Sequence, residues 1–234
     1  MVQWTAHAIG LDLEFVPVNT VKGDHRTKEF LKLNPNAKFP VLQDGDFVLY
    51  ESNAMAQYLL AKYGNKSAWA EALLPSDVNT RASVWQWMDW KHGALRSGCS
   101  GIVRRKVMKK LLPDYSKHSM ALDFVEIPES RQVREMLESL KIVEEQLSAT
   151  KAFIVKGTTK PTLADIALFE EIDQLRILPA GAPPPEGREL AQNYPNIASW
   201  LQRVRAGVPG YDIIHATLNK TIDGVEQQRK AGKL

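Results

Sequence analysis

One stretch decides the fold of this chain: Lys38-Phe39-Pro40-Val41-Leu42-Gln43-Asp44-Gly45-Asp46-Phe47-Val48-Leu49-Tyr50-Glu51-Ser52. Asp44-Gly45 separates two apolar runs, and this dipeptide is a strong hairpin signal because glycine accepts the positive φ of a tight turn. Strands are predicted at residues 41–43 and 47–50, and a helix over residues 52–63 with Ser52 as its cap. Because a helix N-terminus carries a partial positive charge, the stretch predicts a site for a small anion.

The residues before this stretch predict two helices and a strand. Residues 1–9 have a helical pattern that ends at Gly10, in a C-cap position. Residues 11–18 alternate apolar and polar side chains at first and are rich in strand formers, so they predict a strand. Pro17 lacks the N–H group that a ladder needs, which favours an edge strand. Residues 27–33 predict a short helix.

From Asp77 onward the pattern is helical. Residues 77–112 are long enough for a bent or broken helix, with Gly98 and Gly101 as the expected bend points. The proline-rich residues 179–187 predict a surface loop. Further helices are predicted at residues 129–148, 162–175, 196–205 and 211–230. The predicted fold is an α/β unit followed by an all-helical unit.

The helical unit carries one clear local motif, Thr162-Leu163-Ala164-Asp165. Thr162 is predicted to be the N-cap of a helix, and Asp165 then lies at the third helical position. From there its carboxylate can accept a hydrogen bond from the cap N–H, as in a capping box. Both residues are therefore predicted to be structural.

Composition excludes several classes of protein. The chain has 234 residues, 44% of them hydrophobic and 24% charged, with a net charge of +3. This charge is too small to indicate nucleic-acid binding, and the basic cluster Arg104-Arg105-Lys106 with Lys109-Lys110 is interpreted as a solvated helix face. No apolar run reaches the ~20 residues that span a bilayer. Cys99 is the sole cysteine, so we expect no internal disulfide, no cysteine-built metal site and an inert buried thiol.

Lys38-Phe39-Pro40-Val41-Leu42, Asp44-Gly45-Asp46-Phe47 and Glu51-Ser52 together resemble the glutathione-binding domain of cytosolic glutathione transferases, in particular the theta-like class. The resemblance implies a thioredoxin-like domain at residues 1–64, a linker at 65–76 and an all-helical domain at 77–234. It also implies that the peptide bond before Pro40 is cis, which is uncommon and marks a specific backbone shape.

The resemblance implies six glutathione-binding residues: His25, Lys38, Phe39, Pro40, Glu51 and Ser52. Glu51 and Ser52 would hold the γ-glutamyl end, and Phe39 would offer its backbone N–H and C=O to the cysteinyl part, as an added strand does. His25 and Lys38 would hold the glycyl carboxylate. Taken singly, Glu51-Ser52 is also compatible with helix capping alone, and His25 and Lys38 with solvated surface positions.

One part of the family pattern is missing from the alignment. The family opens with a strand, between the second and third strands of its sheet, and a loop that carries the thiol-activating residue, a serine in the theta class. Met1 aligns inside the first helix, so the expected serine lies before Met1 and no catalytic residue is identified. Arg96 is the remaining candidate, because it matches a position near the thiol in some theta enzymes. Gly93 lies where some of them place an aspartate.

The resemblance implies conjugation of the glutathione thiolate to a small hydrophobic electrophile, in a cytoplasmic homodimer that serves detoxification and uses no metal. A dehalogenase or isomerase would share these features. The alternative is a non-catalytic module for protein interaction. An apolar cluster is compatible with a co-substrate pocket, a core or a subunit interface, and it consists of Trp85, Trp87, Met88 and Trp90. The segment from Tyr211 onward is compatible with a cover over that pocket.

Overall fold

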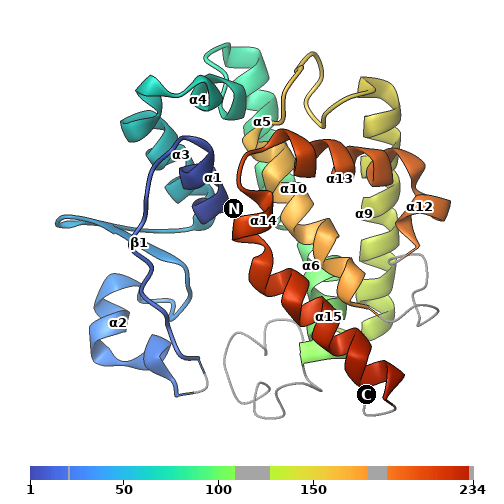
Figure 1. Cartoon of the computed structure of the whole chain (residues 1–234), viewed down its shortest axis with the longest axis horizontal. Helices are drawn as coiled ribbons and strands as arrows, with labels where there is room; N and C mark the ends of the chain where they lie inside the picture. The colour runs from blue at the N-terminus through green and yellow to red at the C-terminus, as the bar shows by residue number, and fades with distance from the viewer. Residues whose placement is uncertain (21, 109–126, 179–188, 232–234) are drawn as a thin grey trace.

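The computed structural model describes residues 1–20, 22–108, 127–178 and 189–231 (Figure 1). It consists of a small α/β unit, on the left in Figure 1, and a bundle of helices. The elements of the small unit are α1 (Val2–Ala8), the 3-10 turn η1 (Asp24–Arg26), α2 (Lys28–Leu33), β1 (Val41–Asp44), β2 (Phe47–Tyr50), α3 (Ser52–Tyr63) and the 3-10 turn η2 (Gly64–Lys66). The predicted α/β-then-helical architecture is confirmed.

The hairpin forms as predicted. β1 and β2 are antiparallel, with Val41 opposite Tyr50 and Asp44 opposite Phe47. Two residues therefore close the turn, and the first of them, Gly45, has a φ of +60°. The Phe39–Pro40 peptide bond is cis, as the resemblance implied.

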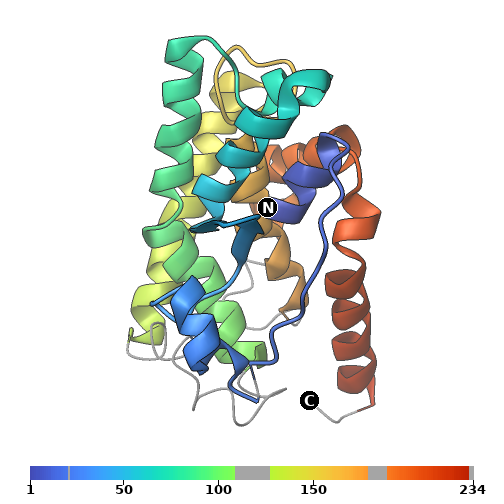
Figure 2. The same cartoon turned by 90° about the vertical axis from the view of Figure 1, so that its left-hand side faces the viewer.

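The strand predicted at residues 11–18 is wrong, because this segment is irregular and runs beside the hairpin without joining it (Figure 2). Leu11 and Leu13 do face inward, against a small apolar cluster built on α1 and α3. Phe15 and Val16 are each 71% exposed. Alternation predicted the buried side correctly, but a strand also needs a ladder partner. In the described part of the chain β1 and β2 pair only with each other.

The helical unit follows the sequence prediction in outline. Its elements are α4 (Ala68–Leu73), α5 (Val78–Trp90), α6 (Ala94–Val103), the π-helical turn η3 (Arg104–Met108), α9 (Glu129–Thr150), α10 (Leu163–Asp173), the 3-10 turn η5 (Gln174–Ile177), α12 (Leu190–Asn193), α13 (Pro195–Gly207), α14 (Tyr211–Ile214) and α15 (Ala216–Lys230). The predicted loop at residues 179–187 lies outside the described residues, as do Lys109 and Lys110 of the basic cluster.

The break in the long predicted helix lies at residues 91–93, between α5 and α6, and not at Gly98 or Gly101. Both glycines lie inside α6, where they allow α9 to approach closely. A Cβ atom at Gly98 would lie 2.4 Å from the Met136 backbone nitrogen, and one at Gly101 would lie 2.5 Å from Gln132 Nε2. The two glycines therefore allow α6 and α9 to pack closely. The prediction that the helix bends at them is wrong.

The capping box at the start of α10 is confirmed, and its carboxylate does more than cap. Asp165 Oδ2 accepts hydrogen bonds from the N–H and the hydroxyl of Thr162, both at 2.8 Å. Asp165 Oδ1 accepts from the Ile154 N–H and the Trp200 indole, also at 2.8 Å. Asp165 is fully buried. It therefore joins the α9–α10 connection and α13 to the central helix α10.

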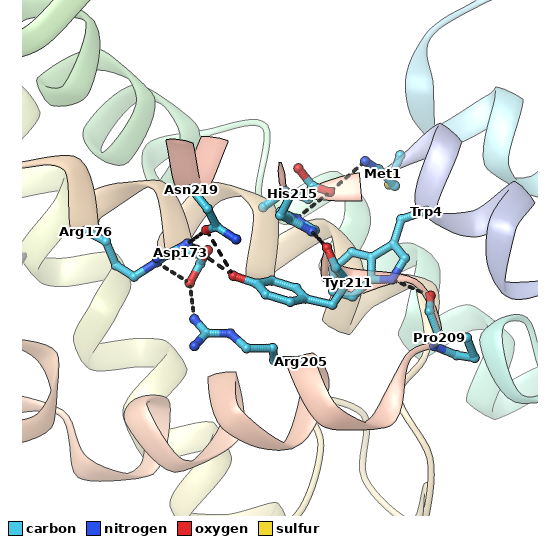
Figure 3. A network of polar contacts seen from close by, with 10 residues as sticks. Met1, Trp4, Asp173, Arg176, Arg205, Pro209, Tyr211, His215 and Asn219 are labelled. Atoms are coloured by element: carbon cyan, nitrogen blue, oxygen red, sulfur yellow. Dashed lines mark hydrogen bonds and ion pairs between the residues drawn. The ribbon is translucent and has the colours of Figure 1, made fainter. Parts of the chain in front are cut away.

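The two units share one apolar core. Trp4 of α1 lies against Phe169 of α10 with ring centroids 5.2 Å apart, and against His215 at 4.7 Å. Its indole N–H donates to the carbonyl of Pro209 at 3.0 Å (Figure 3). Ala56 and Leu60 of α3 belong to the same core cluster. The α1 and α3 helices are thus held firmly against the helical unit.

An ionic cluster around the buried Asp173 links the end of α10 to α13, α14 and α15 (Figure 3). Asp173, which is 1% exposed, accepts from Arg176 Nε at 2.9 Å and from Arg205 Nη2 at 2.9 Å. Arg176 Nη2 also donates to the Tyr211 hydroxyl at 3.2 Å and to Asn219 Oδ1 at 3.0 Å. The predicted helix over 211–230 is broken at His215, and this cluster holds both of its pieces.

Candidate functional site

The N-terminus of α3 carries the Glu51-Ser52 pair. The helix begins at Ser52 as predicted, but the N-cap is Glu51, with φ +73° and ψ 109°, and no side chain caps the first turn. The Glu51 carbonyl accepts the first helical bond, from the Met55 N–H at 3.0 Å. The prediction that Ser52 is the cap is therefore wrong, because the chain turns one residue earlier. The Ser52 hydroxyl is not used as a cap, and the first-turn N–H groups keep their attraction for an anion.

The loop before β1 is shaped by Asn34, which directly follows α2 and was not among the predicted site residues. Asn34 is buried, and its Nδ2 donates to the Lys38 carbonyl at 2.6 Å. Its Oδ1 accepts from the Asn36 N–H at 3.0 Å. These bonds fix the loop immediately before the cis peptide bond, so the Phe39 backbone has a defined orientation. The sequence signal for this role is the asparagine itself, because asparagine side chains commonly accept a hydrogen bond from the backbone N–H two residues on.

The structure brings three of the predicted segments together. Val41 lies opposite Tyr50, so the Phe39–Pro40 and Glu51-Ser52 pairs leave the hairpin at the same end. His25 is fully buried, and its ring meets the Phe39 ring edge-on at a centroid distance of 6.4 Å. A solvated surface position is therefore wrong for His25. Lys38 is exposed, as is the Glu51 side chain.

At the other end of the hairpin lies a polar cluster that the sequence analysis missed. Asp44 Oδ2 accepts from Lys62 Nζ at 2.7 Å, from the Tyr58 hydroxyl at 2.7 Å and from the Tyr63 hydroxyl. The hydrogen bonds from Lys62, Tyr63 and Tyr58, in that order, hold the pKa of Asp44 well below its usual range. The cluster ties the end of β1 to α3. Only the tertiary fold brings these groups together, since the sequence shows them as separate surface residues.

Arg96 does not present a free cation. Its Nη1 lies 2.5 Å from Glu171 Oε1, in an ion pair. The Ser100 hydroxyl donates to the other oxygen of Glu171 at 2.7 Å, and Lys91 Nζ lies 3.9 Å from Oε1. Glu171 is buried, so this cluster belongs to the interior of the bundle. Glu171 therefore offsets the positive charge that Arg96 was expected to place near the glutathione thiol.

The remaining predictions concern single side chains. Cys99 is fully buried, and burial raises the pKa of its thiol well above the ordinary value, which agrees with the prediction of an inert thiol. Met88 is buried in the core, whereas Trp85 is 44% exposed. Among the described residues no cluster of metal-binding side chains is found. None of the helices in the described ranges is long and apolar enough to cross a membrane.

Two family models match the chain. The model of the glutathione S-transferase N-terminal domain matches residues 1–61, and that of the glutathione S-transferase C-terminal domain matches residues 105–207. The chain belongs to the glutathione transferase family.

Its relatives include theta-class enzymes. Human glutathione S-transferase theta-2B is 34% identical over 200 residues, which cover 84% of this chain and 72% of that protein. Human glutathione S-transferase theta-1 is 32% identical over 195 residues, or 82% and 71% of the two chains. The structure of human glutathione transferase theta-2 in complex with glutathione and an unknown ligand is 29% identical and has a TM-score of 0.75, over 98% of this chain and 85% of that one.

Proposed function

We propose that this chain holds glutathione and conjugates its thiolate to a small apolar electrophile, as a theta-class glutathione transferase. One observation carries the proposal: the hairpin register sets the cis Phe39–Pro40 loop beside the Glu51-Ser52 helix start, with His25 against Phe39. The helix N-terminus and Ser52 would bind the γ-glutamyl carboxylate. The Phe39 backbone would pair with the cysteinyl unit. Lys38, which is exposed beside the loop, would attract the glycyl carboxylate.

The chemistry requires a thiolate. A free thiol has a pKa near ~8.5, so only a few per cent is ionised at neutral pH. A hydrogen bond that lowers this pKa by about two units stabilises the thiolate by ~2.7 kcal/mol. The carbon–sulfur bond then forms as a halide leaves the electrophile, or as an activated double bond or ring opens and takes up a proton. This chemistry requires no metal.

We further propose that the thiol-activating hydroxyl belongs to a segment that this chain does not contain. A groove of about 600 Å³ supports this proposal. It lies between the irregular residues 11–16 and the edge of β1 that β2 leaves unpaired. Its apolar lining includes Leu11, Leu13, Leu42 and Leu59. A strand lying there would pair with β1 and enlarge the two-stranded sheet.

Calorimetric titration of this chain with glutathione tests the binding proposal. We expect saturable binding, and no heat of binding at millimolar glutathione would overturn it. Intact mass of the protein purified from its natural source tests the second proposal. About 10–20 additional residues before Met1 would agree with a missing strand and loop, and a chain that starts at Met1 would contradict it.

A non-catalytic interaction module is the second candidate. The observation that favours it is the ion pair between Arg96 and Glu171, which engages the cation expected near the sulfur. Turnover of an activated aryl halide by the native protein separates the two candidates. Conjugate formation with glutathione supports the enzyme, whereas glutathione binding with no conjugate above the uncatalysed rate supports the module.

We also propose that each chain has two domains, at residues 1–64 and 77–234, with α4 in the linker between them. We propose further that the protein is a cytoplasmic homodimer. Val78 is 77% exposed and Trp85 is 44% exposed, and both lie on one face of α5, seven residues apart. Such an apolar stripe is typical of a subunit interface. Light scattering coupled to size exclusion should give the mass of a dimer, and Trp85→Glu should shift it to a monomer.

A further inference from the structure

We propose that His92 is a positioning residue for the glutathione site: it holds Asn53, and with it the first turn of α3, against the end of α5. The test of this role by glutathione binding rests on the function proposed above. Amide hydrogen exchange tests the same role without a ligand.

The contact joins the two units at the point where the site begins. Asn53 is the second residue of α3 and follows Ser52 directly. Its Nδ2 lies 3.2 Å from the carbonyl oxygen of Met88 and 3.2 Å from His92 Nε2. Met88 lies on α5, and His92 lies in the break between α5 and α6. The side chain of one residue therefore spans from the glutathione-binding unit to the helical unit.

The chemistry of the Asn53 amide fixes the roles of its two partners. An amide nitrogen donates two hydrogens and accepts none. One hydrogen goes to the Met88 carbonyl, which can only accept. The other leaves His92 Nε2 as the acceptor, so the imidazole is neutral and carries its proton on Nδ1. A protonated His92 would present a second donor to Asn53, and the contact would be lost.

The support behind His92 is rigid. Met88 is 1% exposed, and Lys91, immediately before His92, is 4% exposed. The turn is closed by backbone bonds from the His92 N–H to the Asp89 carbonyl at 3.0 Å and from the Gly93 N–H to the Trp90 carbonyl at 3.2 Å. His92 is an exposed residue and does not belong to the apolar core, so substitution there leaves the core intact. Holding a binding group through a fixed neighbour is how sites keep their geometry.

The charges around His92 favour its accepting form. Partial burial, then Lys91 and Arg96, lower the pKa of His92, while Glu171 and Glu51 act in the opposite direction. Lys91 adjoins the ring in the chain, Arg96 lies on α6, Glu171 on α10 and Glu51 before α3. The neutral form is therefore present at pH 7. The contact should be lost as pH falls through this lowered pKa.

Calorimetry with glutathione on His92→Ala, Asn53→Ala, the double variant and His92→Gln tests the proposal. His92→Ala should weaken binding by about three- to tenfold, the loss of one neutral hydrogen bond. Asn53→Ala should weaken it further, because it also removes the bond to the Met88 carbonyl. The double variant should be no weaker than Asn53→Ala, because that change already removes the contact with His92. Glutamine can accept through Oε1 and does not titrate, so His92→Gln should keep the affinity and lose the fall on the acid side.

Amide hydrogen exchange at residues 52–56 is the readout that needs no ligand. Exchange there should be faster in His92→Ala than in the wild type, and restored in His92→Gln. Gln86→Ala, an exposed change on α5, is the control and should alter neither readout. If the wild type does not bind glutathione, the proposed function fails while exchange still decides the role of His92. Unchanged exchange in His92→Ala, or additive losses in the double variant, would overturn the positioning role.

Discussion

Val41 and Tyr50 are direct partners across the hairpin. This one pairing determines that the loop ending in Pro40 and the turn at Glu51 emerge side by side, although eleven positions separate them in the sequence. A shift of register by one residue would move Glu51 away from the loop and turn both strands over. The Asp44 cluster on α3 and the Gly45 turn hold the register, so elements distant from the site maintain its geometry.

The Ser52 hydroxyl should serve binding and not stability. Because Glu51 is the N-cap and Ser52 makes no cap bond, Ser52→Ala should leave the unfolding free energy within about 0.5 kcal/mol of wild type. It should weaken glutathione binding by roughly 1.5–3 kcal/mol, the loss of a bond to a charged group. Ser67 caps α4 by accepting from the Trp69 N–H, so Ser67→Ala is the matched control. It should cost about 1 kcal/mol of stability and no affinity.

Asp165 should be among the most sensitive positions for folding. Asp165→Ala would leave three buried N–H donors without an acceptor, those of Ile154, Thr162 and the Trp200 indole. At about 1–3 kcal/mol for each group, we expect a loss of about 3 kcal/mol or more in urea unfolding. Trp200→Phe removes one donor and should cost less. A change in Asp165→Ala limited to glutathione affinity would contradict a structural role.

The Asp44 cluster should make the stability of the chain depend on pH in the acid range. Its folded-state pKa lies below the ordinary 3.8, so its stabilising effect is complete above pH 3.8 and is lost as pH falls through the lower value. Asp44→Asn should reduce stability at neutral pH and flatten the pH dependence below about pH 4. Urea midpoints measured through this range test the prediction. Equal acid sensitivity in the two proteins would contradict it.

Gly98 should resist even the smallest substitution. In Gly98→Ala the new methyl group would meet the Met136 backbone at 2.4–2.6 Å, so α6 and α9 would have to separate. We expect a loss of roughly 1–3 kcal/mol, measured by thermal or urea unfolding. A Cβ atom at Gly224 on α15 would instead enter open space. Gly224→Ala should therefore be neutral or stabilising by up to about 1 kcal/mol.

Local signals predicted the parts of the molecule that local interactions determine. The Asp44-Gly45 turn, the start of α3 and the Thr162–Asp165 box each depend on residues close together in the chain, and each is confirmed. The break between α5 and α6 was placed at the wrong residues, because a glycine that permits close packing has the same local pattern as one that permits a bend. The strand at residues 11–18 depended on a partner that alternation cannot reveal.

For the site too, the sequence predicted the local segments and not the contacts between them. Its segments could be named from the sequence, but the burial of His25 and the bonds from Asn34 depend on how the loop folds back on itself. The Glu171 cluster that engages Arg96 joins residues 75 positions apart. The Asn53 and His92 contact joins residues 39 apart. Neither has a periodic signal, since polar contacts between residues so far apart in the chain are set by tertiary packing alone.

The unpaired edge of β1 has a practical consequence for anyone who prepares this chain. A free strand edge is a template for another chain, and here the groove beside it is lined in part by Val16, which is 71% exposed. Edge-to-edge association should make the preparation lose monodispersity as its concentration rises. A short synthetic peptide of alternating apolar and polar residues, added in excess, should occupy the edge and keep the protein in solution.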